Sequence, residues 1–108
     1  MLRVIGLPPE PADAAAEFHA EWLGAARSRI AQLTGEDRSL LLHLPEEDHT
    51  HAEWRLAAVR MMAREAAPVR VNLIGCDHAA KVERFAAYLS QAPGITGQYL
   101  PANFQYAR

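Results

Sequence analysis

Two short segments of this chain concentrate the side chains that bind metals or transfer protons. The first, Glu46–His51, holds three acidic residues and two histidines, and the second, Cys76–His78, holds a thiol, a carboxylate and an imidazole. Imidazole, thiolate and carboxylate are the ligand types of zinc sites, and a catalytic zinc takes three of them from the protein. The candidate metal ligands are His49, His51, Cys76 and His78.

The same side chains have a simpler interpretation. Acidic residues and histidines at the start of a helix cap it or favour the positive end of its dipole. The chain has neither a Cys-x-x-Cys nor a His-Glu-x-x-His motif. We therefore predict no bound metal, no cofactor and no catalytic residue, and keep the metal site as the alternative. Cys76 beside His78 would suit a nucleophile, but a lone cysteine after an apolar strand is more typical of a core.

Composition narrows the classes of function. Half of the 108 residues are hydrophobic, which is too many for a disordered chain. Eleven basic residues against 13 acidic ones leave a charge of -2, whereas a nucleic-acid binder needs a basic face. No apolar run approaches the ~20 residues of a membrane span. The charge and the lack of a long apolar run predict that neither nucleic acid nor a membrane is a partner. A single cysteine fits a reducing compartment, so we expect a cytoplasmic protein.

Apolar strands alternate with amphipathic helices along the chain. This order predicts an α/β domain spanning residues 1–108, a small Rossmann-like fold with about four parallel strands, three helices and right-handed crossovers. The tail Pro101–Arg108 should dock through Phe104 and Tyr106. The expected strands are Leu2–Ile5, Ser39–Leu44, Val69–Ile74 and Gly97–Leu100. The expected helices run from Pro11 to Leu33, from His51 to Ala67 and from His78 to Gln91.

Local signals mark the ends of these helices. Gly35 follows the last apolar residue of the first helix, as a C-terminal cap does. Thr50 and Glu53, three residues apart, predict a capping box at the second helix. Asp77 is the expected cap of the third helix.

The second helix is apolar on more than one side, so it should be buried on more than one side. One side would face the sheet and the other a second copy of the chain, which predicts a homodimer or another protein partner. The alternative is that neighbouring helices of the same chain cover it. The predicted interface residues are Phe18, Trp22, Trp54, Ala58, Met61 and Met62.

From the second helix onward the chain resembles the C-terminal half of short-chain dehydrogenases/reductases. The stretch Ala57–Asn72 is similar to that family's helix ending in Glu-Leu-Ala-Pro and its strand Ile-Arg-Val-Asn. Val82–Ser90 is similar to the helix before its last strand, and Ile95–Pro101 to its Ile-Thr-Gly-Gln-x-Leu-Pro strand. The resemblance implies a Rossmann-type domain that lacks the cofactor-binding half.

The resemblance also implies that the family's chemistry is lost. This chain has no glycine-rich turn to hold a dinucleotide. The family's catalytic Tyr and Lys correspond to Asp48 and Ala52, and no Ser lies near Pro45 or Glu46. The family's Pro-Gly aligns with Cys76 and Asp77, and its closing Asp-Gly-Gly with Asn103-Phe104-Gln105. These substitutions predict a protein without dehydrogenase activity.

Two functions therefore stay open. The first is a non-catalytic module that forms homodimers or docks on another protein. The second is a small-ligand or metal-binding protein, or a divergent enzyme, that uses the loops Glu46–His51 and Cys76–His78. Convergence of these loops on a pocket would favour the second function, and a flat solvated edge the first.

Overall fold

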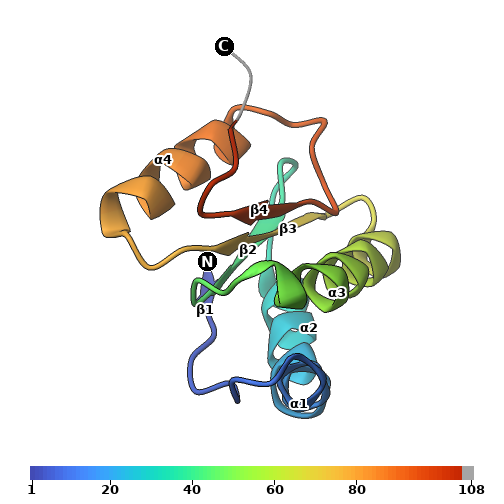
Figure 1. Cartoon of the computed structure of the whole chain (residues 1–108). Helices are drawn as coiled ribbons and strands as arrows, with labels where there is room; N and C mark the ends of the chain where they lie inside the picture. Colours follow the sequence, from blue (N-terminus) through green and yellow to red (C-terminus); the bar gives the residue numbers. More distant parts are fainter. Residues whose placement is uncertain (106–108) are drawn as a thin grey trace.

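The computed structural model describes residues 1–105, so the predicted docking of Tyr106 lies outside the described residues. None of the helices described is long and apolar enough to cross a membrane. Strands and helices alternate in the predicted order (Figure 1). The strands are β1 (Leu2–Arg3), β2 (Ser39–Leu44), β3 (Arg70–Gly75) and β4 (Tyr99–Pro101). The helical segments are α1 (Pro11–Glu17), η1 (Phe18–Trp22), α2 (Leu23–Gln32), η2 (His49–His51), α3 (Ala52–Ala66) and α4 (Ala79–Ser90).

The strands form one parallel sheet in the order β1-β2-β3-β4. The central pair runs in register from Ser39 opposite Arg70 to Leu44 opposite Gly75. Every residue of β3 is buried, because a central parallel strand is covered on both faces. The predicted α/β, Rossmann-like architecture is confirmed.

Helices cover both faces of the sheet, with α1, α2 and α3 on one side and α4 on the other (Figure 1). The pleat divides the apolar side chains between two cores. Leu42 and Leu73 belong to the core beneath α1–α3, whereas Leu41 and Ile74 belong to the core beneath α4. The sheet is thus the middle of three layers.

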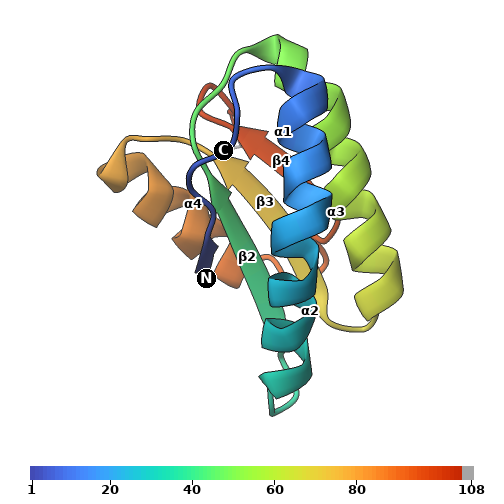
Figure 2. The same cartoon turned by 90° about the horizontal axis from the view of Figure 1, so that it is seen from below.

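The crossovers differ in hand. The connections from β1 to β2 and from β2 to β3 pass over the same face and are right-handed (Figure 2). The connection from β3 to β4 continues in the same direction across the sheet, but its helix α4 lies on the opposite face. This last crossover is therefore left-handed, and the prediction of right-handed crossovers throughout is wrong. The apolar stripe of α4, which contains Val82 and Phe85, packs on the face that α1–α3 leave open.

The first predicted helix forms as one rod with a π-helical segment, η1, in its middle. The backbone N–H of Leu23 bonds to the carbonyl of Phe18, five residues earlier. This wider turn shifts the helical phase between Ala14, which is buried before it, and Ala26, which is buried after it. Gly35 has a positive φ of 92°, but it lies in the turn after the helix cap at Leu33.

Two predicted caps are wrong. Asp48 takes the place of the Thr50–Glu53 capping box, because its carboxylate accepts the backbone N–H of Thr50 at 2.9 Å. Asp77 does not cap α4, whose N-terminus has no side-chain cap. The Asp77 carboxylate instead accepts the backbone N–H of Glu46 at 3.1 Å.

The buried Arg70 closes the amino-terminal edge of the sheet. Its Nη1 donates to the carbonyls of Leu89 (3.0 Å) and Ala92 (3.2 Å) at the end of α4. Its Nη2 lies 3.1 Å from the Asp37 carboxylate, which compensates the guanidinium charge. Near the C-terminal end of the described residues, Phe104 packs edge-on against Phe85 at a centroid distance of 6.2 Å, as predicted for the tail.

Candidate functional site

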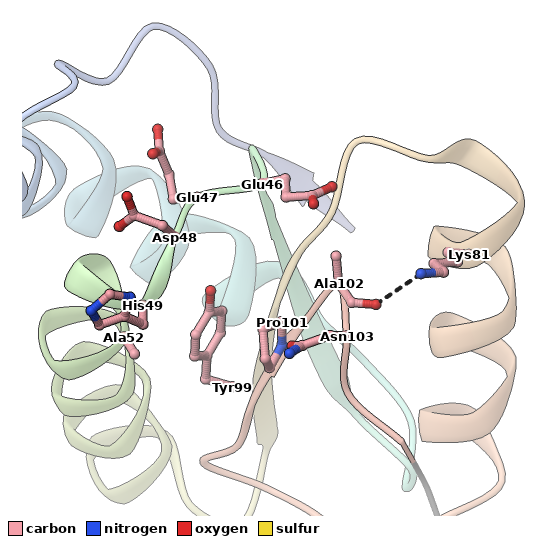
Figure 3. A pocket seen from close by; sticks show the side chains of 10 residues that line it. All are labelled: Glu46, Glu47, Asp48, His49, Ala52, Lys81, Tyr99, Pro101, Ala102 and Asn103. Carbon is pink, nitrogen blue, oxygen red and sulfur yellow. Dashed lines mark hydrogen bonds between the residues drawn. The ribbon is translucent and has the colours of Figure 1, made fainter.

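An open pocket of about 610 Å³ lies at the carboxyl-terminal edge of the sheet (Figure 3). Open α/β sheets bind ligands at this edge, because the loops that follow adjacent strands meet there. The loop after β2, the end of β4 and the first turn of α4 form its walls. The lining residues are Glu46, Glu47, Asp48, His49, Ala52, Lys81, Tyr99, Pro101, Ala102 and Asn103.

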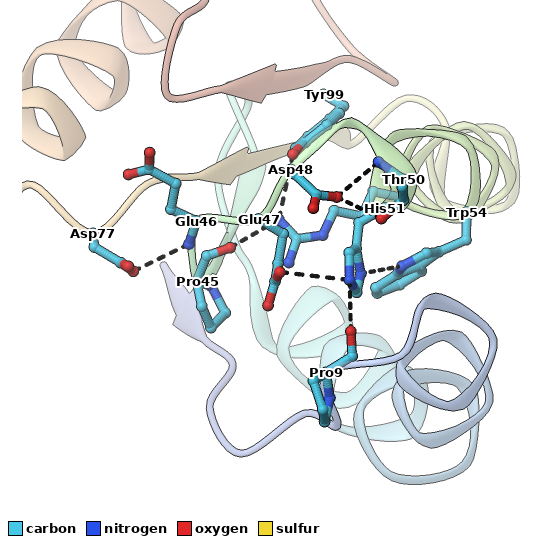
Figure 4. Close-up of polar contacts among 11 residues, drawn as sticks. Pro9, Pro45, Glu46, Glu47, Asp48, Thr50, His51, Trp54, Asp77 and Tyr99 are labelled. Carbon is cyan, nitrogen blue, oxygen red and sulfur yellow. Dashed lines mark hydrogen bonds and ion pairs between the residues drawn. The ribbon is translucent and has the colours of Figure 1, made fainter.

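The loops after β2 and β3 are joined by direct hydrogen bonds. The contact between Asp77 and the Glu46 backbone ties one loop to the other (Figure 4). His43 Nε2 lies 2.8 Å from the carbonyl oxygen of Cys76, on the face of the sheet that carries α4. The two loops therefore contact each other, but they do not share a pocket. The pocket opens between the loop after β2 and the end of β4, and no residue of Cys76–His78 lines it.

Asp48 and Ala52, which the sequence resemblance aligns with the family's Tyr and Lys, both line this pocket. The Asp48 carboxylate accepts hydrogen bonds from the hydroxyl and from the backbone N–H of Thr50. Both bonds lower the pKa of the carboxyl from its ordinary 3.8, and the bond from the hydroxyl has the larger effect. Asp48 is therefore an ionised acceptor at neutral pH rather than a proton donor. Ala52 contributes only a methyl group.

The four candidate metal ligands do not come together. Across residues 1–105, no three His, Cys, Asp or Glu side chains are placed to hold a metal ion. His49 is exposed at the pocket rim and His78 is exposed at the start of α4. Cys76 is fully buried in the core beneath α4, and its Sγ accepts the backbone N–H of His78 at 3.4 Å. The alternative of a metal site therefore has no ligand set in this part of the chain.

His51 is buried and has a structural contact on each ring nitrogen (Figure 4). Trp54 Nε1, which can only donate, bonds to Nδ1 at 3.0 Å. Nε2 therefore carries the hydrogen and donates it to the carbonyl of Pro9 at 3.0 Å. His51 joins the loop before α1 to the start of α3, and both of its ring nitrogens are engaged in these contacts, which does not favour its candidate role as a metal ligand.

The predicted interface residues divide into two groups. Phe18, Ala58 and Met62 are buried in the core of a single chain, between α1, α3 and the sheet. These three side chains have no surface to offer a partner, because helices of the same chain cover them. The half-buried members are Trp22, Trp54 and Met61.

A buried guanidinium at the back of the pocket was not among the predicted site residues. Arg55 Nη1 donates to the carbonyl of Pro45 at 2.9 Å and to the hydroxyl of Tyr99 at 3.3 Å. The guanidinium also lies 5.6 and 5.7 Å from the ring centroids of Trp54 and Tyr99. A Cβ added at Gly75 would lie 2.5 Å from Arg55 Nη1 and 2.9 Å from the Tyr99 hydroxyl. The glycine at the end of β3 thus makes room for this pair.

The sequence holds only a weak signal for this pair. Arg55 interrupts an otherwise apolar stretch of α3, but Tyr99 stands 44 residues away along the chain. Their contact depends on how far α3 and β4 overlap at the carboxyl edge. Residue spacing does not reveal that overlap.

Comparison with known proteins gives the family. A family model described as SDR-like, short chain dehydrogenase-like protein, matches residues 2–102. Searches of curated proteins and of solved structures gave no significant match. The correspondence with the second half of the dehydrogenase fold alone stays a prediction. The model match, the parallel sheet and the position of the pocket agree, and the chain belongs to the SDR-like family of short-chain dehydrogenase-like proteins.

Proposed function

We propose that this chain is a non-catalytic SDR-like domain that acts by associating with a second copy of itself. The observation that carries the proposal is the set of half-buried large apolar side chains on the α1–α3 layer. Trp22, Trp54 and Met61 pack partly on the core and keep part of their surface outside it. Aromatic residues and methionine are enriched at protein interfaces, and a two-fold dimer uses the same patch on both copies.

The residues at the family's catalytic positions support the non-catalytic part of the proposal. A dehydrogenase needs a group that gives a proton to the substrate, and the lowered pKa of Asp48 makes it an acceptor. Titration of the protein with NADH, followed by nicotinamide fluorescence, should give no saturable change. A saturable increase would contradict this part. The lone Cys76 supports a reducing compartment, and we place the protein in the cytoplasm on that ground.

Analytical ultracentrifugation of matched variants tests the association. The wild type should sediment as a dimer at micromolar concentration. Met61→Glu introduces a charge on the α1–α3 layer and should weaken the dimer at least ~10-fold, because a buried unpaired charge is strongly unfavourable at an interface. Ala87→Glu introduces the same charge on exposed α4 and should leave the dimer intact.

A monomeric wild type contradicts the association, as does a Met61→Glu variant that sediments like the wild type. Circular dichroism of both variants shows whether they keep the native fold. If Met61→Glu is unfolded, Trp22→Gln in η1 is the second variant. It removes an aromatic surface without adding charge.

A further inference from the structure

Arg55 is the largest fully buried side chain among residues 1–105, with 1% of its surface exposed. Its Nε has no hydrogen-bond partner, and none of the ion pairs within the described chain includes it. The backbone carbonyl of Pro45, the Tyr99 hydroxyl and two aromatic rings surround the cation without neutralising it. An uncompensated charge in surroundings of low polarity exerts its field over a longer distance than one in water.

Tyr99 lies between this cation and the pocket. Arg55 can only donate, so the Tyr99 oxygen accepts its hydrogen bond, and the hydroxyl hydrogen is left for another acceptor. Within residues 1–105 no such acceptor is recorded. Figure 3 shows the Tyr99 hydroxyl directed into the pocket between the loop after β2 and the first turn of α4. The Tyr99 hydroxyl can thus donate a hydrogen bond to a ligand oxygen.

A second donor stands on the opposite wall. Lys81 Nζ donates one hydrogen to the carbonyl of Ala102 at 3.1 Å, and an ammonium has two more. Two of the nearby carboxylates are engaged by their own loop. Asp48 accepts from Thr50, and Glu47 lies 3.5 Å from the buried His51 ring. Figure 3 shows the carboxylates of Glu47 and Asp48 turned away from the Tyr99 hydroxyl.

We propose that this pocket binds the carboxylate of a small organic acid, with Tyr99 and Lys81 as its donors and Arg55 supplying the positive field behind them. The acidic rim disfavours a dianion such as phosphate, so a single negative charge fits better. A volume of about 610 Å³ accommodates a small metabolite. This binding site goes beyond the association proposed above, and neither depends on the other.

Nuclear magnetic resonance titration with two probes of equal length tests the proposal. Propionate carries the carboxylate and propylamine carries the opposite charge. Propionate should produce saturable shifts at the amides of Tyr99 and Asn103, and propylamine should not. Tyr99→Phe keeps the ring against Arg55 but removes the hydroxyl, and should weaken propionate binding ~10-fold or more. Tyr88→Phe, outside this pocket, is the matched control and should bind propionate like the wild type.

Three results would overturn the proposal. Propionate shifts that do not saturate exclude a built site. Equal shifts with propylamine exclude selection for negative charge, and unchanged affinity in Tyr99→Phe excludes the hydroxyl as donor. If Tyr99→Phe does not fold, Lys81→Gln replaces it, because Lys81 is a half-buried side chain at the start of α4. Its propionate affinity should also fall, and wild-type affinity there would count against the proposal.

Discussion

The two buried arginines among residues 1–105, Arg70 and Arg55, lie at opposite ends of strand β3 and differ in their bonding partners. Arg70, at the amino-terminal edge, has a carboxylate partner and donates to two carbonyls at the end of α4. Arg55, at the carboxyl-terminal edge, has no carboxylate partner within the described chain and an unbonded Nε. Arg70 has its polar partners within the fold, whereas a buried polar atom without a partner, such as Arg55 Nε, is rare in a folded protein and needs an explanation. The comparison supports a structural role for the amino-terminal edge of the sheet and agrees with the carboxylate site proposed at the carboxyl-terminal edge.

Replacing Arg70 should have the largest effect on stability. Arg70→Met removes the bonds to the carbonyls of Leu89 and Ala92 and the bond to the Asp37 carboxylate, so three charge-assisted contacts of one buried side chain are lost together. We expect the free energy of unfolding to fall by about 2–3 kcal/mol. Urea denaturation followed by circular dichroism measures it. A loss below about 1 kcal/mol would remove the structural role from this edge.

Gly75→Ala should cause the next largest loss of stability. The new Cβ overlaps with Arg55 Nη1 and the Tyr99 hydroxyl, both at the ends of side chains that can shift. We expect a loss of about 1–2 kcal/mol. Gly24→Ala is the matched control, since nothing lies within 4 Å of its Cβ and it sits inside α2, where alanine should stabilise by about 0.5–1 kcal/mol. Equal effects at the two glycines would mean that Arg55 and Tyr99 are not tightly placed.

Arg55→Met should change stability less than either. It loses the bond to Pro45, but it also removes a buried charge that has no counter-ion. These effects oppose each other, so we expect a change within about 1 kcal/mol in either direction. The same urea series measures it. A loss as large as that of Arg70→Met would show that the two arginines are equivalent and would end the comparison.

The smallest expected effect is on the pH dependence of stability, through Asp48 at the pocket rim. The pKa of Asp48 is lowered in the folded chain, so its contribution to stability is present above 3.8 and is lost as pH falls through the folded value. Asp48→Asn should be less stable than the wild type near neutral pH, and the difference should shrink in acid. Thr50→Val removes the hydroxyl donor and should lose the larger part of this acid dependence. Thermal melts across the pH range would show parallel curves if the bond had no role.

Periodic apolar residues predict most of this fold. Ser39–Leu44 is a nearly continuous apolar run, and Val69–Ile74 is rich in Val, Leu and Ile. The structure places both at the centre of the sheet, with the second shifted by one residue. The hand of the last crossover was not predictable in this way. Periodicity shows that α4 has an apolar face, but both faces of a parallel sheet are apolar.

The candidate site was predicted only in part. The loop Glu46–His51 does form a wall of the pocket, because the end of a parallel strand marks the edge where loops gather. The structural role of His51 could not be predicted, because its partners are Pro9, 42 residues away, and Trp54, whose indole can only donate. Contacts of this kind depend on packing between elements, which residue types alone do not show.

The separation of the apolar residues into two cores has a consequence for hydrogen exchange. α4 is the only helix on its face among the described elements, and its core is separate from the one that α1–α3 share with the sheet. Elements with separate cores can unfold locally without global unfolding. The amides of α4 should therefore exchange by sub-global opening, which carries Lys81 away while Arg55 and Tyr99 stay in place. The pocket would then open and close on the timescale of that local transition.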